Sequence, residues 1–136
     1  KHYIYGAAVL NDHSTPDAVY KIAKKIGELT REHENIKNVE SVLLGTGAGG
    51  LSNLESVVAL ATGFEEGASP DARLIIYTPN ASTKAEIEKE ISSSLAEKIA
   101  EKIKLTPSLF GIGVDLNEPK MRMARALSRI RFRSLG

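Results

Sequence analysis

Four glycines, Gly45, Gly47, Gly49 and Gly50, stand together between an apolar run and a segment with helical spacing. Because glycine has no Cβ, it adopts positive φ angles and lets successive backbone N–H groups turn toward one point. Such a loop, followed by a helix N-terminus, forms a concave site for an anion. A tight turn without a ligand is the alternative, but one glycine would suffice for it and four cost conformational entropy. The loop therefore favours a site for phosphate or diphosphate.

Gly45, Gly47 and Gly50 also match the spacing G-x-G-x-x-G of dinucleotide-binding loops, which follow a strand and precede a helix. That fingerprint requires an acidic residue at the end of the next strand to hold a ribose hydroxyl. No acidic residue follows the next predicted strand, residues 73–77. No Lys-Ser or Lys-Thr pair follows the glycines, which excludes a P-loop. A dinucleotide-dependent enzyme is accordingly the weakest of three functional hypotheses.

The histidines show no catalytic or metal-binding pattern. His2, His13 and His33 lie far apart and lack the spacing of metal ligands, and the chain has no cysteine. Asp12 and Ser14 flank His13, but neighbours in one turn rarely face each other as a catalytic triad, so we expect turn chemistry there. We therefore assign no catalytic residue, no metal ligand and no cofactor, and a binding domain is a better expectation than an enzyme.

Positive charge is concentrated at the C-terminal end of the chain. Residues 119–136 carry six basic side chains and no acidic one, so this segment has a charge of +6 and residues 1–118 a charge of −5. A basic amphipathic segment docks on nucleic acid, an anionic membrane or an acidic partner, and arginine suits bidentate phosphate or carboxylate partners. A solvated helix face with arginines near its C-terminus is an equally good interpretation. The predicted partner-binding residues are Arg122, Arg125, Arg129, Arg131 and Arg133.

Strand and helix signals alternate along the whole chain. Strands are predicted at 2–10, 39–44, 73–77 and 109–116, and a turn at 11–14. Helices are predicted at about 16–34, from a Ser52–Glu55 capping box to Gly63 or Gly67, from a Thr83–Glu86 capping box to 103, and from Pro119 onward. This order predicts a three-layer αβα domain with a mainly parallel sheet over residues 1–118. Residues 119–136 are predicted to form a basic amphipathic helix that packs on the domain or extends from it.

The segment from Val39 to Ser52 resembles the second ligand loop of macro and macro-like domains, in which a strand runs into a Thr-Gly-x-x-Gly turn and then a helix. Tyr3-Ile4-Tyr5-Gly6 resembles the family strand before its long helix, and residues 73–77 resemble the next strand. The resemblance spans roughly residues 2–104, and only the loop is specific. The acidic adenine-binding residue, the Asn-Ala-Ala-Asn-like segment and the first glycine loop of the family do not occur in this sequence.

The resemblance implies binding of ADP-ribose or a related nucleotide, with the loop amides around its diphosphate. The ligand-binding residues would be Gly45, Thr46, Gly47, Ala48, Gly49, Gly50 and Leu51. The leading hypothesis is therefore a regulatory nucleotide-binding domain. The alternative is a non-catalytic interaction or assembly module with an empty site, which uses the basic C-terminal segment to bind an acidic protein or a second copy of itself.

Length and composition set the remaining bounds. The 136 residues suit one domain, and 42% hydrophobic residues provide a core. The overall net charge of +1 does not indicate binding to nucleic acid or to a membrane. No apolar run reaches the roughly 18 residues that span a bilayer, and no signal peptide is visible. We expect a cytoplasmic protein, and a chain that begins with Lys1 directly before a predicted strand is expected to be a segment of a longer one.

Overall fold

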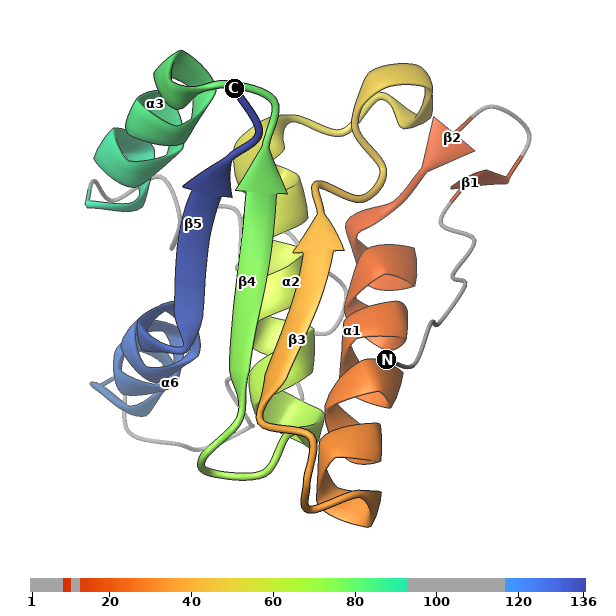
Figure 1. Cartoon of the computed structure of the whole chain (residues 1–136). Helices are drawn as coiled ribbons and strands as arrows, with labels where there is room; N and C mark the ends of the chain where they lie inside the picture. Colours follow the sequence, from red (N-terminus) through yellow and green to blue (C-terminus); the bar gives the residue numbers. More distant parts are fainter. Residues whose placement is uncertain (1–8, 11–12, 93–116) are drawn as a thin grey trace.

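A three-stranded parallel sheet forms the centre of the computed structural model, which describes residues 9–10, 13–92 and 117–136. The strands are β3 (Asn38–Val42), β4 (Arg73–Thr78) and β5 (Ile130–Ser134), in the spatial order β3-β4-β5. The central strand is β4, and its short apolar sequence fits a position between two neighbours. The predicted α/β class with a parallel sheet is confirmed (Figure 1).

Four helices and a small hairpin accompany this sheet in the described residues. The helices are α1 (Pro16–Glu32), α2 (Asn53–Gly67), α3 (Ala81–Ile91) and α6 (Asn117–Ser128). The hairpin pairs β1 (Val9–Leu10) with β2 (His13–Ser14) in antiparallel orientation. A single 3₁₀ turn, η1 (Gly47–Gly49), lies between β3 and α2. The capping box predicted at Ser52 and Glu55 is confirmed at the start of α2.

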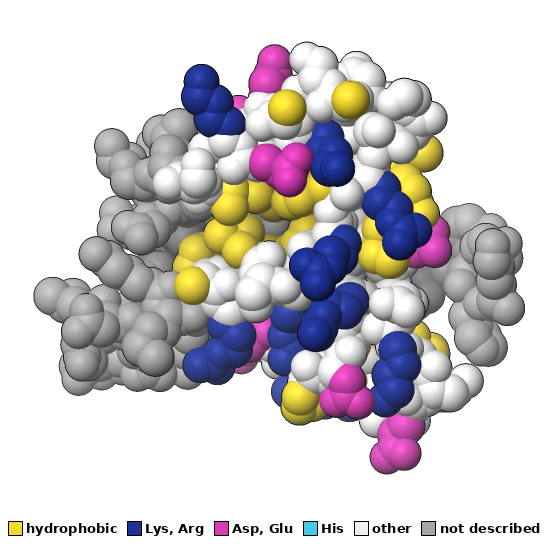
Figure 2. Space-filling view, turned by 60° about the vertical axis from the view of Figure 1, so that its left-hand side comes forward, with side chains coloured by type: hydrophobic (Ala, Val, Ile, Leu, Met, Phe, Trp, Pro, Cys, Tyr) yellow, Lys and Arg dark blue, Asp and Glu magenta, His cyan; other side chains and the backbone are white. Residues whose placement is uncertain are grey.

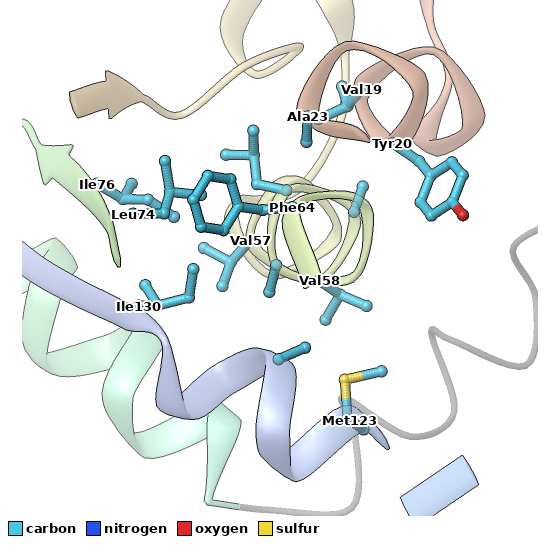
Figure 3. Close-up of a cluster of buried hydrophobic side chains, with 14 of the residues drawn as sticks. Val19, Tyr20, Ala23, Val57, Val58, Phe64, Leu74, Ile76, Met123 and Ile130 are labelled. Atoms are coloured by element: carbon cyan, nitrogen blue, oxygen red, sulfur yellow. The ribbon is translucent and has the colours of Figure 1, made fainter. Parts of the chain in front are cut away.

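Helix α2 is the core element, because residues on all of its sides are buried. Its Val57, Val58 and Phe64 are at most 1% exposed. Figure 3 shows β4 on one side of these residues, α1 on another and α6 on a third. The surrounding side chains come from the other three helices and from the sheet: Val19, Ala23, Leu74, Ile76, Ile87, Met123 and Ile130. Each large aliphatic or aromatic side chain buried in this way contributes about 1.5–3 kcal/mol.

Glycines allow α1 and α2 to approach each other closely. A Cβ added to Gly63 would lie 2.3 Å from the carbonyl oxygen of Tyr20, and one added to Gly67 would lie 2.2 Å from that of Lys24. A Cβ on Gly27 would likewise meet the backbone of the other helix. Later residues of α2 therefore meet later residues of α1, so the two helices run in the same direction. This orientation places both helix N-termini at one end of the molecule.

The described helices all pack on one face of the sheet. Leu74 and Ile76 of β4 point into the core, together with Ile130 and Phe132 of β5. Because successive side chains of a strand point to opposite faces, the residues between them form an outer face. No described helix contributes to this outer face, so the second helical layer of the predicted three-layer arrangement is not found in the described residues.

Several predicted element boundaries were wrong. The N-cap of α3 is Asn80, whose side-chain oxygen accepts from the amide of Thr83 at 2.8 Å, so the predicted capping box at Thr83 is wrong. The chain leaves β4 directly into this helix, and Asn80 is the first side chain able to cap it. Strand β3 ends at Val42 and not at residue 44. His13 and Ser14, predicted to lie in a turn, form β2.

The largest correction concerns the end of the chain. A helix was predicted through to the C-terminus, but it ends at Ser128, and residues 130–134 form β5. The order Ile-Arg-Phe-Arg alternates apolar and polar residues, which fits a strand beside the open edge of β4. The predicted strand at 109–116, the residues 93–103 of the predicted third helix and residues 2–8 of the first strand lie outside the described residues.

Candidate functional site

The glycine loop lies at the carboxyl end of β3 and turns the chain into α2. Three of its glycines have positive φ angles, +80° at Gly45, +68° at Gly47 and +81° at Gly50. These angles cost an L-residue with a Cβ roughly 1–2 kcal/mol. The fourth, Gly49, is buried and sits in the 3₁₀ turn. Three glycines are therefore required by the backbone path, whether or not a ligand binds.

Hydrogen bonds inside the loop fix its shape. The amide of Leu51 donates to the carbonyl of Gly45, and that of Gly50 donates to the carbonyl of Gly47, both at 3.0 Å. The hydroxyl of Thr46 donates to the carbonyl of Leu43 at 3.3 Å. The loop thus closes on itself without help from a ligand.

Three amides of the loop keep their hydrogen-bonding capacity. Within the part of the chain that the structure describes, the N–H groups of Thr46, Gly47 and Ala48 donate to no backbone or side-chain acceptor. Gly47 and Ala48 are exposed, and a Cβ placed on Gly47 would have nothing within 4 Å. A ligand can therefore approach this side of the loop, and a backbone N–H there can donate a hydrogen bond to an anion.

Gly45 has a different role from Gly47. A Cβ on Gly45 would lie 2.6 Å from Oγ of Ser14 and 2.7 Å from Cδ1 of Leu51. The absence of a side chain thus lets β2 pack against the base of the loop. Gly45 serves the packing of the loop, while Gly47 lies on its open side.

Helix N-termini gather at the same edge of the sheet as the loop (Figure 1). Helix α1 begins after Thr15, whose Oγ1 accepts from the amide of Ala18 at 3.1 Å, and α2 begins after Ser52. Helix α3 begins after Asn80 at the carboxyl end of β4. A helix N-terminus carries about half a positive charge. The edge is therefore electropositive through backbone dipoles.

The capping box limits what α2 offers to a ligand. The Glu55 carboxylate accepts from the amide of Ser52 at 3.0 Å, and the Ser52 hydroxyl accepts from the amide of Glu55 at 3.1 Å. The backbone N–H groups of Ser52 and Glu55 thus already have acceptors, and the negative charge of the Glu55 carboxylate lies near the start of the helix. The loop amides, and not the helix end, are the better anion donors.

All seven predicted ligand residues lie in this one loop or at its exit to α2. The other polar residues considered from the sequence do not join them. His13 lies in β2, whereas His33 caps the C-terminus of α1 at the opposite end of that helix. Among the described residues, no group of three or more His, Asp or Glu side chains is arranged to hold a metal ion.

The predicted partner-binding arginines separate into two groups. Arg125 and Arg129 of the C-terminal segment both approach Glu65 of α2, and Arg129 also donates to the carbonyl of Ser69 at 2.6 Å. Arg131 and Arg133 are exposed on β5. The side chain of Arg122 lies outside the described part. The basic segment is thus partly an internal ion-pair partner and partly a strand of the central sheet.

A polar pocket that the sequence did not reveal lies at the other end of the sheet. Its volume is about 320 Å³, and it is lined by Thr30, Arg31, Glu34, Lys37, Ser69 and Asp71. Nζ of Lys37 lies 2.9 Å from Oδ2 of Asp71, and this hydrogen bond and charge lower the pKa of the Asp71 carboxyl. The lining holds two basic and two acidic side chains, so its formal charge is zero.

No family model matches the chain, and no curated protein or solved structure compared with it matches either. No helix in the described ranges is long and apolar enough to cross a membrane. The loop geometry and the resemblance of its sequence are therefore the two observations that bear on a ligand.

Proposed function

We propose that this chain is a regulatory domain that binds a nucleotide of the ADP-ribose type and holds its diphosphate on the glycine loop. The observation that carries the proposal is that the amides of Thr46, Gly47 and Ala48 have no acceptor among the described residues, in a loop already closed by its own hydrogen bonds. Preformed donors of this kind bind an anion without the entropy cost of ordering the loop. The resemblance of residues 39–52 to a macro-like ligand loop supplies the nucleotide class.

The diphosphate would be held by neutral donors. No Lys or Arg occurs between Leu43 and Glu55. Hydrogen bonds from backbone N–H to an ionised oxygen contribute about 1.5–3 kcal/mol each. Affinity for the diphosphate should therefore depend only weakly on salt, unlike sites built from several basic side chains.

Binding is tested by titration calorimetry with ADP-ribose, ADP and inorganic pyrophosphate. The decisive variant is Ala48→Pro, which removes one N–H from the loop, and the matched control is Ala48→Ser, which keeps it. Ala48 lies inside the 3₁₀ turn, where the φ angle of proline is tolerated. We expect Ala48→Pro to weaken binding about tenfold or more, since 1.4 kcal/mol corresponds to tenfold, and Ala48→Ser to bind as the parent does.

Circular dichroism of both variants shows whether the fold is retained, so lost binding is not confused with unfolding. A Gly47→Val variant, strained at φ +68°, should lose the ligand as well. The proposal is wrong if none of the three ligands binds the chain or the longest protein that contains it. Equal affinity of Ala48→Pro and Ala48→Ser would show that the loop amides are not the site.

A further inference from the structure

The outer face of the sheet combines arginine with exposed apolar side chains. The strand register places Glu40, Ile75 and Arg131 in one row across the sheet. The next row consists of Val42, Tyr77 and Arg133. Each of these residues alternates along its strand with one that faces the core. The name "outer face" is used below for these two rows.

Apolar exposure is confined to one end of the outer face, because Ile75 in its first row is only 7% exposed. Val42 is 52% exposed and Leu135 is 67% exposed, and these are the large hydrophobic residues with high exposure in the described ranges. The amide of Leu135 donates to the carbonyl of Thr78 at 2.8 Å, so the residue extends β5 past its last ladder position. In the alternation of that strand, Leu135 falls on the same side as Arg131 and Arg133. The exposed apolar side chains are thus Val42, in the row of Tyr77, and Leu135, past the carboxyl end of β5.

The charge of this surface is positive. Within the described residues, Arg131 and Arg133 form no ion pair, in contrast to Arg129 against Glu65. The side chain of Arg73, on the same face of β4, donates to the carbonyl of its neighbour Ala72 and pairs with no described carboxylate. Glu40 is the acidic residue of the two rows, so arginines outnumber it. Figure 2 shows Lys and Arg side chains gathered beside hydrophobic ones when the β5 side of the molecule comes forward.

No described helix covers the outer face, whereas parallel strands occur almost only where both faces are covered. We propose that the outer face docks an acidic, amphipathic segment of a partner protein. Its apolar side chains would cover Val42, Tyr77 and Leu135, and its carboxylates would pair with Arg131 and Arg133. Arginine presents two parallel donors to a carboxylate, which gives such a pair both strength and orientation.

The composition of the face argues against two other occupants. A nucleic acid gains nothing from the exposed Val42 and Leu135, is repelled by Glu40, and would find a single aromatic residue for stacking at Tyr77. A second copy joined through the same face would place arginines near arginines, with one Glu40 per face to oppose them. An acidic protein segment satisfies both the charge and the apolar area.

The test uses a library of random 12-residue peptides displayed on phage and selected on the immobilised chain. Enriched peptides are resynthesised with a fluorescent label, and their affinity is measured by anisotropy. The variant Arg131→Glu/Arg133→Glu is compared with Lys25→Glu/Lys89→Glu, which makes the same change of net charge at exposed positions of α1 and α3. We expect peptides that contain both acidic and apolar residues, with affinity reduced about tenfold or more by the arginine reversal alone.

Further variants separate this surface from the glycine loop. Leu135→Ser should also weaken the peptides, whereas Ala48→Pro should leave their affinity unchanged. Enrichment of neutral or basic peptides, or of none, overturns the proposal. Binding of the labelled oligonucleotides dT20 or rU20 that is lost on arginine reversal would assign the face to nucleic acid instead. Sedimentation that shows self-association abolished by the same reversal would assign it to a second copy, again against the proposal.

Discussion

The close approach of α1 and α2 makes Gly63 a sensitive position. A Cβ at this residue would lie 2.3 Å from the carbonyl oxygen of Tyr20 and 2.9 Å from Cβ of Ala23, so Gly63→Ala must push the two helices apart. An extra methyl group in a packed core typically costs about 1–3 kcal/mol. A contact with backbone belongs at the upper end of this range, because a main chain cannot move aside as a side chain can. The gain in helix propensity opposes this by about 1 kcal/mol. We expect a net loss of about 2 kcal/mol.

Urea denaturation followed by circular dichroism measures this loss. Ala85→Gly, at an exposed position of α3, is the control that measures the propensity difference with the opposite sign. The double variant Gly63→Ala/Ala23→Gly removes the contact with the Ala23 side chain and keeps the one with the Tyr20 backbone. Once the separately measured cost of Ala23→Gly is subtracted, the double variant should recover only part of the stability. Gly63→Ala with the stability of the parent or more would refute the close approach. Full recovery in the double variant would show that the side chain, and not the backbone, sets the spacing.

Two further predictions concern ion pairs at the amino end of the sheet, where Lys37, Asp71 and Arg129 precede β3, β4 and β5. Arg129→Ala should destabilise the fold by about 2 kcal/mol, because it leaves the Glu65 side chain, which is 16% exposed, without its closest cation. Arg125→Ala should cost less than about 0.5 kcal/mol, because the Arg125 side chain is 59% exposed and lies 3.9 Å from the Glu65 carboxylate. Urea titration checks both, and equal losses would contradict the assignment. Lys37→Met should raise the pKa of Asp71 toward its ordinary value, as followed by NMR titration of that carboxyl. Since the Asp71 pKa is lowered in the fold, the small stability that the ion pair confers is present above the ordinary carboxyl pKa and is lost as the pH falls through the folded value. An unchanged Asp71 pKa in Lys37→Met would exclude Lys37 as the cause of the lowered pKa.

Local sequence rules recovered most of the elements in the middle of the chain. Proline after Thr15, the Ser52–Glu55 box and the apolar run of β4 each act within a few residues, so they predict helix starts and a strand without knowledge of the fold. The glycine loop was found for the same reason, because positive φ angles are a local demand. Whether its amides bind a nucleotide stays a prediction.

The C-terminal segment shows where local rules fail. The spacing of Met123, Leu127 and Ile130 fits a helix, and the alternation from Ile130 to Arg133 fits a strand equally well. The choice depends on the free edge of β4, a neighbour more than fifty residues away in sequence. That pairing removes Arg131 and Arg133 from a helix surface and places them on the outer face.

The sequence by itself determined the parallel α/β class, the start of α2 and the positive φ angles in the glycine loop, because each follows from the order and intrinsic preferences of neighbouring residues. Only the tertiary structure decided that Arg129 turns inward to Glu65, that Gly63 faces the backbone of α1, and that the described helices cover one face of the sheet. These facts depend on which surfaces meet after the chain folds. The same physical distinction separates the loop, a local feature, from the outer face, which exists only once β3, β4 and β5 are side by side.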